Sequence, residues 1–540
     1  MAGLWTMIRL ILRRDRVKLP LTFLIAVLSL VSMVPLLNDV YGDAESIAVL
    51  YSTMSVNPAM LFMTGPIDAP TFGSLVTIET LLWWGMGFAI INTMLVVRHT
   101  RHNEEIGTQE LLLSGQASRA SSLVAVLMVA LVFNLLLALG IGAGVELVND
   151  GYWQSSSSWL YGAAFAAFGF VWAALAAVVV QLVESGRSAN GMLMGLVGLT
   201  FVGRGIGDFM GKVGEQGLHE PAIINAFNPF GWLQATRPLH EPDWAPLLIS
   251  ISVAFLAIGL GFVLLAKRDV GAGLLPGRRG KQRAGHFLST SLGLTWYLQK
   301  NIFIGWLVGT LVMVATIGAL VPQMTDVLGQ SDSMNQILTS IGGVGELLPS
   351  FMAAMMAISC MLVFGYVVHG LSKLRSEEAS GHLESLLATK TTRFKWIGYH
   401  VGFIFVAGAA MLAMIGAVLA GLSNLLADFN LSVGEYVLAS LSYLPVMLAF
   451  MALYVLLFGL LPRLASGVSW LYFGFVFFVL WIGPMLNLGQ AVMDISVMAH
   501  VPTPPVEDVT WAPILVISAL SIGLITIGLA AFRRRNAGVS

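Results

Sequence analysis

Long apolar runs separated by short polar segments form the main pattern of this 540-residue chain. Each run is about 20 residues long, which is the length that an α-helix needs to cross the hydrocarbon of a bilayer. Because backbone polar groups must be satisfied inside the lipid, such runs are expected to be helices. The pattern predicts twelve spans, at about 19–37, 75–97, 123–146, 159–183, 191–211, 245–266, 302–321, 351–370, 398–420, 438–461, 467–487 and 512–532.

Two further segments have an amphipathic pattern. In residues 4–18, Trp5, Ile8 and Leu12 recur at helical spacing with arginines between them, and residues 288–301 have a similar character. Helices of this kind lie in the headgroup plane of a membrane. With 57% hydrophobic and only 11% charged residues, the chain is predicted to be an all-α membrane protein with interfacial helices beside its spans.

A charged loop occurs twice, after the second and the eighth predicted span. The two copies align without a gap and share the pattern R-x-x-E-x-x-G-x-x-E-x-L-L. The positions that carry the pattern are Arg101, Glu104, Gly107, Glu110, Leu112 and Leu113 in the first copy, and Arg375, Glu378, Gly381, Glu384, Leu386 and Leu387 in the second. Several identities in a fixed register predict an internal duplication.

Two shorter repeats support the same register. The string R-x-A-x-G occurs at 187–191 and 463–467, and the string WAP occurs at 244–246 and 511–513. We therefore predict two parallel six-helix repeats, a topology found among membrane transporters. The predicted domains are a first transmembrane half at 1–266, a polar linker at 267–287 and a second transmembrane half at 288–540.

The basic residues predict the orientation. With twelve spans, all of the 28 Lys and Arg residues except Arg204, Lys212 and Arg237 fall on one side of the membrane. Basic residues accumulate on the cytosolic side of membrane proteins. Both termini and both copies of the charged loop are therefore predicted to be cytosolic, in a multi-pass protein of the plasma membrane.

The pattern of the loop predicts its local structure. Arg101 and Glu104 are i,i+3 neighbours on a helix and are expected to pair. Gly107, like Gly381, is expected to end one helix, after which the E-x-L-L run starts a short second one. The two leucines of each copy are expected to form an exposed apolar ridge, which is typical of a docking surface.

With these motifs the whole chain resembles the permeases of type-2 ATP-binding-cassette (ABC) exporters, in particular the fused twelve-span exporters of polyketide antibiotics and other drugs. The residues that carry the resemblance are the two E-x-x-G-x-x-E-x-L-L loops, the two R-x-A-x-G turns, NPAMLFMTGP at 57–66 and NPFGWLQATRP at 228–238. The resemblance implies that each charged loop is a coupling helix, which sits in a cleft of a separate ATPase subunit.

This resemblance also implies the partners. The chain contains no G-x-x-x-x-G-K-[ST] phosphate loop; its nearest string, GRRGKQ at 277–282, has the wrong spacing. The chain is therefore expected to be a transport subunit and not an enzyme. It would hold no cofactor itself, and ATP and Mg would be bound by two copies of a cytosolic ABC ATPase. Membrane lipids and a hydrophobic small-molecule substrate are the other expected partners.

The resemblance further implies that spans 2 and 5 face spans 8 and 11 across a substrate cavity. The residues predicted for this pathway are Glu79, Trp83, Trp84, Phe88, Asn92, Phe201, Arg204 and Asp208 in the first half, and Met355, Met356, Ser359, Phe473, Phe477, Phe478 and Trp481 in the second. Ionisable groups at membrane depth are candidates for function. Arg204 and Asp208 are i,i+4 neighbours, so they either neutralise each other or contact substrate, and Glu79 is either interfacial or part of the pathway.

Two other functions compete with the exporter. An ion-coupled secondary transporter is compatible with two parallel halves, but it requires protonatable residues at mid-membrane and leaves the duplicated loop unexplained. A membrane sensor that signals to a cytosolic partner is less favoured. The His99 and His102 pair is interpreted as part of a solvated loop and not as a metal site, and no nucleic-acid signature is present.

Overall fold

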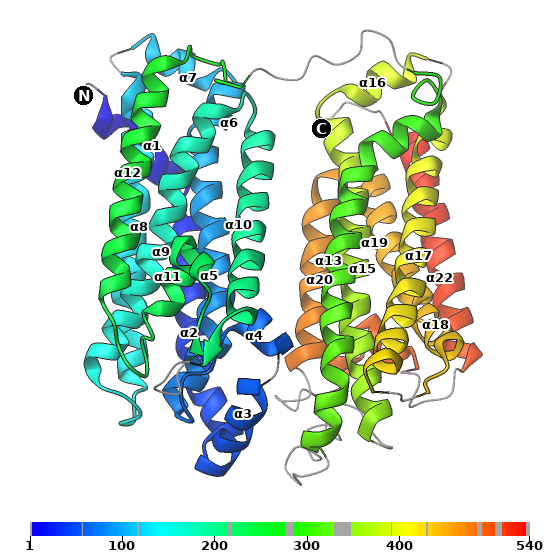
Figure 1. Cartoon of the computed structure of the whole chain (residues 1–540). Coiled ribbons are helices and arrows are strands. Elements are labelled where there is room, and N and C mark those ends of the chain that lie inside the picture. Colours follow the sequence, from blue (N-terminus) through cyan, green and yellow to red (C-terminus); the bar gives the residue numbers. More distant parts are fainter. Residues whose placement is uncertain are drawn as a thin grey trace. The chain divides into compact units, whose positions relative to one another are not determined.

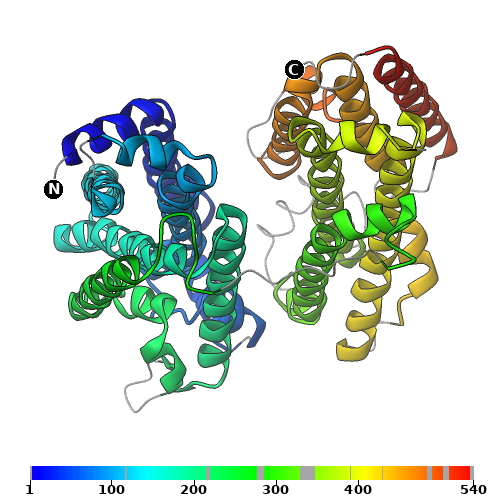
Figure 2. The same cartoon turned by 90° about the horizontal axis from the view of Figure 1, so that it is seen from above.

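The computed structural model confirms an all-α membrane protein. Twelve helices are long and apolar enough to cross a membrane, and they coincide with the twelve predicted spans. Contacts divide the chain into two compact units, Met1–Gly280 and Lys281–Ser540, and the boundary falls inside the predicted linker. Within each unit the axes of the long helices are roughly aligned with one another (Figures 1 and 2).

The structure describes residues 3–56, 58–115, 118–213, 219–275, 285–328, 347–389, 391–427, 430–482, 489–502 and 510–535. For Leu113 and Trp481 it describes the backbone only, so the predicted roles of these two side chains lie outside the described part.

The first unit contains six membrane-length helices joined by short helices and one small hairpin. Its elements are α1 (Leu4–Arg14), α2 (Lys18–Tyr41), α3 (Ala44–Val56), α4 (Pro58–Thr64), α5 (Phe72–His99), α6 (Arg101–Glu105), α7 (Thr108–Leu113), α8 (Arg119–Leu147), α9 (Ser155–Leu182), α10 (Gly186–Phe209), β1 (Lys212–Val213), β2 (His219–Glu220), η1 (Ile223–Phe227), α11 (Pro229–Ala235) and α12 (Ala245–Lys267). The strands β1 and β2 pair antiparallel.

The second unit also contributes six membrane-length segments. Its elements are α13 (Ser291–Leu328), α15 (Leu347–Ala379), α16 (His382–Leu387), α17 (Arg393–Ala427), α18 (Val433–Leu441), α19 (Leu444–Leu460), α20 (Pro462–Ile482), α21 (Gln490–Met493), η2 (Val497–His500) and α22 (Trp511–Arg534). The tenth predicted span is thus built from α18 and α19. Pro445 at the start of α19 explains the interruption, because proline supplies no backbone N–H and is tolerated only in the first turn of a helix.

One predicted element was wrong. Residues 288–301 do not form a separate interfacial helix, because α13 runs without a break from Ser291 into the seventh span. The first half does break at the corresponding place, where α1 ends at Arg14 and α2 begins at Lys18. Pro20 favours this break, because it fits only the first turn of a helix, whereas the sequence around Lys300 holds no proline.

Corresponding helices pack together in the core of each unit. In the first unit α9 packs against α5, α8 and α12, and in the second unit α19 packs against α15 and α22. Gly261 on α12 meets the backbone of Ala177 on α9, and Gly528 on α22 meets the backbone of Val455 on α19. Small residues allow such close backbone approach in membranes, where packing replaces the hydrophobic effect as the driving force.

A leucine at Gly528 is therefore expected to separate α22 from α19. A side-chain carbon there would lie 2.5 Å from the carbonyl oxygen of Val455, whereas Gly523 on the same helix has open space around it. We expect Gly528→Leu to lower the free energy of unfolding by about 1–3 kcal/mol, the usual cost of overpacking, and Gly523→Leu to leave it nearly unchanged. Thermal unfolding of the detergent-solubilised protein measures both; equal melting temperatures for the two variants would contradict the packing.

Candidate functional site

The two charged loops have the same backbone conformation. Gly107 precedes α7 with φ 75° and ψ −2°, and Gly381 precedes α16 with φ 75° and ψ −1°. This left-handed conformation favours glycine, which carries no Cβ. No atom lies within 4 Å of a Cβ built on either residue, so the backbone and not crowding requires glycine. The predicted helix break and the short second helix are therefore both observed.

In the first loop, a buried carboxylate is held by two arginines. Nη1 of Arg101 lies 2.7 Å from Oε2 of Glu104, as the i,i+3 spacing predicts. Arg268, directly after α12, makes a two-pronged contact, with Nη2 2.5 Å from Oε1 and Nη1 2.9 Å from Oε2. Forked arginine–carboxylate pairs of this kind are among the strongest hydrogen-bonded contacts in proteins. We call Arg101, Glu104 and Arg268 the first clamp.

The first clamp also reaches the end of α9. Nε of Arg101 donates to the backbone oxygen of Val180 at 3.0 Å, and Nε of Arg268 donates to Oε1 of Gln181 at 2.6 Å. Both arginine side chains are almost fully buried. The charged loop, the end of α9 and the end of α12 are therefore joined through one set of charge-assisted hydrogen bonds.

The second loop repeats the arrangement. Glu378, whose side chain is buried, lies 3.5 Å from Nη1 of Arg375, and its Oε1 lies 2.9 Å from Nη2 of Arg535. Arg535 directly follows α22. We call Arg375, Glu378 and Arg535 the second clamp. Its contact within the loop is longer than in the first clamp, but the carboxylate again lies between an arginine of the loop and an arginine after the last helix of its unit.

Sequence analysis missed Arg268 and Arg535. The signal was present, because the WAP repeat sets the register of the two sixth helices, and counting 24 residues on from Trp244 and from Trp511 reaches these two arginines. Arg119 and Arg393, the arginines that begin the helix after each loop, support the same register. Arg119 donates to the backbone oxygen of Arg268 at 2.7 Å, and Arg393 donates to the backbone oxygen of Arg535.

The prediction that the motif leucines form an exposed apolar ridge is wrong for Leu112, Leu386 and Leu387. Leu112 is half-buried and packs against the core of the first unit, and Leu386 and Leu387 pack against the core of the second. The exposed apolar side chain of α7 is Leu111 instead, at 76% exposure. Leu112 therefore seats α7 on the first unit, and Leu386 and Leu387 seat α16 on the second. Glu110 and Glu384 of the motif, in contrast, are exposed.

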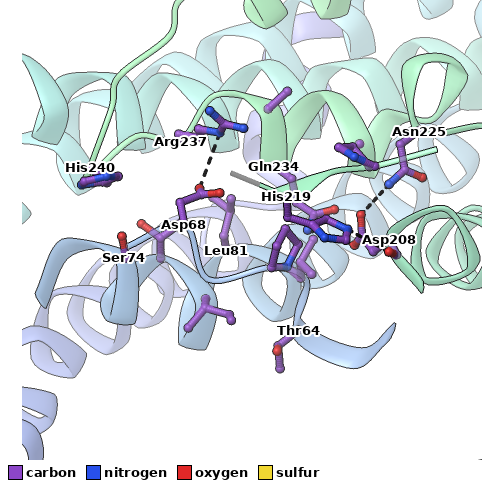
Figure 3. Close-up of a pocket in the computed structure, with 17 residues that line it drawn as sticks. Thr64, Asp68, Ser74, Leu81, Asp208, His219, Asn225, Gln234, Arg237 and His240 are labelled. Atoms are coloured by element: carbon purple, nitrogen blue, oxygen red, sulfur yellow. Dashed lines mark hydrogen bonds and ion pairs between the residues drawn. The ribbon is translucent and has the colours of Figure 1, made fainter. Parts of the chain in front are cut away.

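At the opposite end of the first unit, Arg204 and Asp208 form a buried pair. Nη1 of Arg204 lies 2.9 Å from Oδ2 of Asp208, and Nη2 donates to the backbone oxygen of Phe62 at 2.8 Å. Asp208 also accepts from Asn225 at 2.6 Å and from Gln234 at 3.2 Å (Figure 3). The pair thus fastens α4, η1 and α11 to α10. This geometry supports the structural alternative for Arg204 and Asp208.

A small polar cavity adjoins this pair. Its volume is about 100 Å³, and the lining includes Asp68, Asp208, His219 and Arg237 (Figure 3). Burial raises the pKa of Asp68, although Arg237 lies 3.5 Å away. Pockets for drug-sized ligands measure roughly 300–1,000 Å³. The cavity is large enough for a few water molecules but not for an amphipathic drug.

The other predicted pathway residues divide into two groups. One group lies inside the packing of its own unit: Phe88, Asn92, Phe201, Met356 and Ser359 are buried. Asn92 exchanges hydrogen bonds with Asn134, at 3.2 and 2.7 Å. The second group keeps exposed or partly exposed surface, and it consists of Glu79, Trp83, Trp84, Met355, Phe473, Phe477 and Phe478. The second group retains surface that a substrate can reach.

No group of three His, Cys, Asp or Glu side chains is placed to hold a metal ion in the described part of the chain. Twelve apolar helices in two units define a multi-pass membrane protein.

Comparison with known proteins gives the family. The family described as "Multidrug efflux system permease Rv1217c, C-terminal domain" matches residues 71–265 and 288–533. The multidrug efflux system permease protein Rv1217c of Mycobacterium tuberculosis is 31% identical over 544 residues, which cover 99% of this chain and 95% of the relative. The chain therefore belongs to this family of multidrug efflux permeases.

For the buried Arg204–Asp208 pair, removal of one partner is expected to destabilise the protein more than replacement of both partners by apolar residues. Asp208→Ala leaves a buried arginine without a counter-charge, which costs roughly 3–5 kcal/mol, whereas Arg204→Met combined with Asp208→Leu is expected to cost much less. Thermal unfolding in detergent gives the comparison. Glu241→Ala, at an exposed ion pair with Arg237, serves as the control with little expected change. A double variant as unstable as Asp208→Ala would contradict this view.

Proposed function

We propose that this chain is the membrane-spanning subunit of an ATP-driven exporter of amphipathic drugs, antibiotics or lipids, coupled to two copies of a cytosolic ABC ATPase. The observation that carries the proposal is the pair of clamped loops, which present the same short helix after the second and the eighth span. Two alike surfaces fit two alike partner subunits. ATP and Mg would be bound by these partners, since the sequence of the chain shows no phosphate loop.

In this proposal the end of each unit that carries its charged loop faces the cytosol. In the first unit α1, α6 and α7 lie at this end, and α3 and α4 lie at the other (Figure 1). The bias of basic residues supports this orientation, in which both termini would be cytosolic, and we propose the plasma membrane as the location. Clusters of arginine at the clamps thus lie on the side where ATP is available.

The clamps supply a path for coupling. A force on α7 acts on the exposed Glu110 and Leu111 and reaches the buried Glu104 through one turn of chain. Because Glu104 is held by two arginines, the force passes to the ends of α9 and α12 instead of bending the loop. Glu378 and Arg535 would transmit force to α22 in the same way.

The substrate path is proposed along the exposed aromatic residues, not through the buried polar cluster. Trp83, Phe477 and Phe478 each expose about 40% of their surface. Aromatic surface adapts to large apolar compounds with little loss of side-chain entropy. Arg204 and Asp208 would instead hold the outer segments of the first unit in place during transport.

Reconstitution tests the proposed function. The chain should co-purify from native membranes with an ABC ATPase subunit, and the complex in proteoliposomes should hydrolyse ATP faster when a transported drug is added, since substrate and nucleotide states are coupled. Isolation of the active exporter from native membranes without any ATPase subunit would contradict the proposal. An imposed proton gradient without ATP gives the control for secondary transport.

The clamps are expected to be required for coupling and not for assembly. Arg268→Ala with Arg535→Ala should lower drug-stimulated ATP hydrolysis and efflux at least tenfold, because the loops lose their connection to α12 and α22, while the ATPase still co-purifies and keeps its basal rate. Arg→Lys at both sites should rescue only part of the activity, because lysine cannot form the two-pronged contact.

The matched control is Arg13→Ala with Arg534→Ala, which removes the same charge from the last turns of α1 and α22 outside the clamps. Equal losses in the control and the clamp variant would indicate a general effect of charge. Undiminished coupling in the clamp variant would rule out the proposed path.

A further inference from the structure

A large cleft opens on the first unit beside the charged loop. Its walls are the start of α2, the last turns of α5 and the start of α10, and its volume is about 1020 Å³. Roughly 300–1,000 Å³ is the usual range for small-molecule pockets, so the cleft is at the upper end. It is distinct from the polar cavity beside Asp208, with which it shares no lining residue.

The rim of the cleft is cationic. Arg14, Lys18 and Arg187 line it and are exposed, and none of them has a carboxylate partner within ion-pair distance among the described residues. Nη1 of Arg14 donates to Oδ1 of Asn103 at 2.7 Å, which holds this guanidinium at the rim. Two sides of the cleft, α1–α2 and α10, thus each bring positive charge to the same opening.

The acidic residues of the cleft are already engaged. Asp15 is buried and lies 2.7 Å from Nη1 of Arg98, and it also contacts His99. Glu105 accepts a hydrogen bond from the backbone nitrogen of Gly186 at 3.2 Å, at the start of α10. Among the described lining residues, an anion that enters the cleft therefore meets three cations without a carboxylate partner, while Glu105 is the acidic residue that has no cationic partner.

The floor of the cleft is apolar. Leu19, Ile91 and Met94 line it, and Met94 is 53% exposed. Asn190 adds one polar atom, because its Oδ1 is buried and has no hydrogen-bond partner among the described residues. Cationic groups above an apolar groove match a molecule with an anionic head and a hydrocarbon tail.

We propose that this cleft binds one anionic phospholipid. The phosphate lies between Arg14, Lys18 and Arg187, and the acyl chains follow Leu19, Ile91 and Met94 into the bilayer. The amphipathic α1 places the rim at headgroup level, and basic residues near an anionic leaflet each contribute roughly a fivefold gain in binding. A zwitterionic lipid or a cationic drug gains little from three cations. Only the assignment to the cytosolic leaflet depends on the proposed function.

The position of the cleft links the lipid to the loop. His102, Glu105 and Ile106 of the charged loop line the same cleft. Arg98, which neutralises Asp15 there, lies three residues before Arg101 of the first clamp. A bound lipid would therefore stabilise the join between α1, α5 and α10 at the place where the loop begins.

Native mass spectrometry of the purified chain in detergent tests the site. Phosphatidylglycerol and phosphatidylcholine with identical acyl chains are titrated against the natural protein and against two triple variants. Arg14→Gln, Lys18→Gln and Arg187→Gln together should lower the affinity for phosphatidylglycerol at least tenfold. Arg9→Gln, Arg13→Gln and Lys267→Gln together, which remove equal charge from exposed positions outside the cleft, should change it less than twofold.

Equal losses of affinity for phosphatidylglycerol in the two triple variants would overturn the proposal, and so would equal affinity of the natural protein for both lipids. Displacement of the lipid by a transported drug would also overturn it, because the cleft would then be an entry site for substrate. Thermal unfolding checks that both triple variants are folded. The lipid titration uses no ATPase subunit, so its outcome does not depend on whether the proposed coupling is correct. Likewise, the measurement of drug-stimulated ATP hydrolysis does not depend on whether the cleft binds a lipid.

Discussion

A charged carboxylate buried at the end of a membrane helix is stable only when its charge is compensated. Glu104 is compensated by Arg101 from its own helical turn and by Arg268 from the end of the unit. The second contact fixes the ends of segments that are far apart in the sequence. Removal of one partner from such a buried set leaves an unpaired charge, which costs several kcal/mol. Glu104 therefore connects α6 to the end of α12, and the bonds from Arg101 and Arg268 to Val180 and Gln181 add the end of α9.

The same constraint occurs in the second unit with different neighbours. Glu378 is compensated by Arg375 and Arg535, and Gly381, which follows it by three residues, has the same left-handed backbone as Gly107. The close approaches of Gly261 to α9 and of Gly528 to α19 fall in one register, as do Arg268 and Arg535. The sequence repeats, the conformation of the two glycines and the two sets of ion pairs are thus alike in the two units.

Sequence alone predicted the spans well because their signal is local. Apolar length and basic flanks identified all twelve segments, and Gly107 and Gly381 identified the helix breaks. The errors concern features that depend on packing. Whether Leu112 is exposed depends on how α7 lies against α1 and α8, and whether residues 288–301 form a separate helix depends on the absence of a breaker near Lys300. Arg268 lies far from Glu104 in sequence, so only the register of the repeat could have connected them.

The two halves differ in sequence at the positions of the Arg204–Asp208 pair, and this difference bears on mechanism. Arg204 and Asp208 correspond by the repeat register to Leu480 and Pro484, so the second half has no such pair at these positions. An ion-coupled transporter needs a carboxylate that gains and loses a proton in each cycle. Asp208 lies 2.9 Å from the buried guanidinium of Arg204 and accepts hydrogen bonds from Asn225 and Gln234. Through these contacts and the bond from Arg204 to the backbone oxygen of Phe62, the pair joins α4, η1 and α11 to α10. This geometry favours a structural role for the pair over the role of a proton carrier.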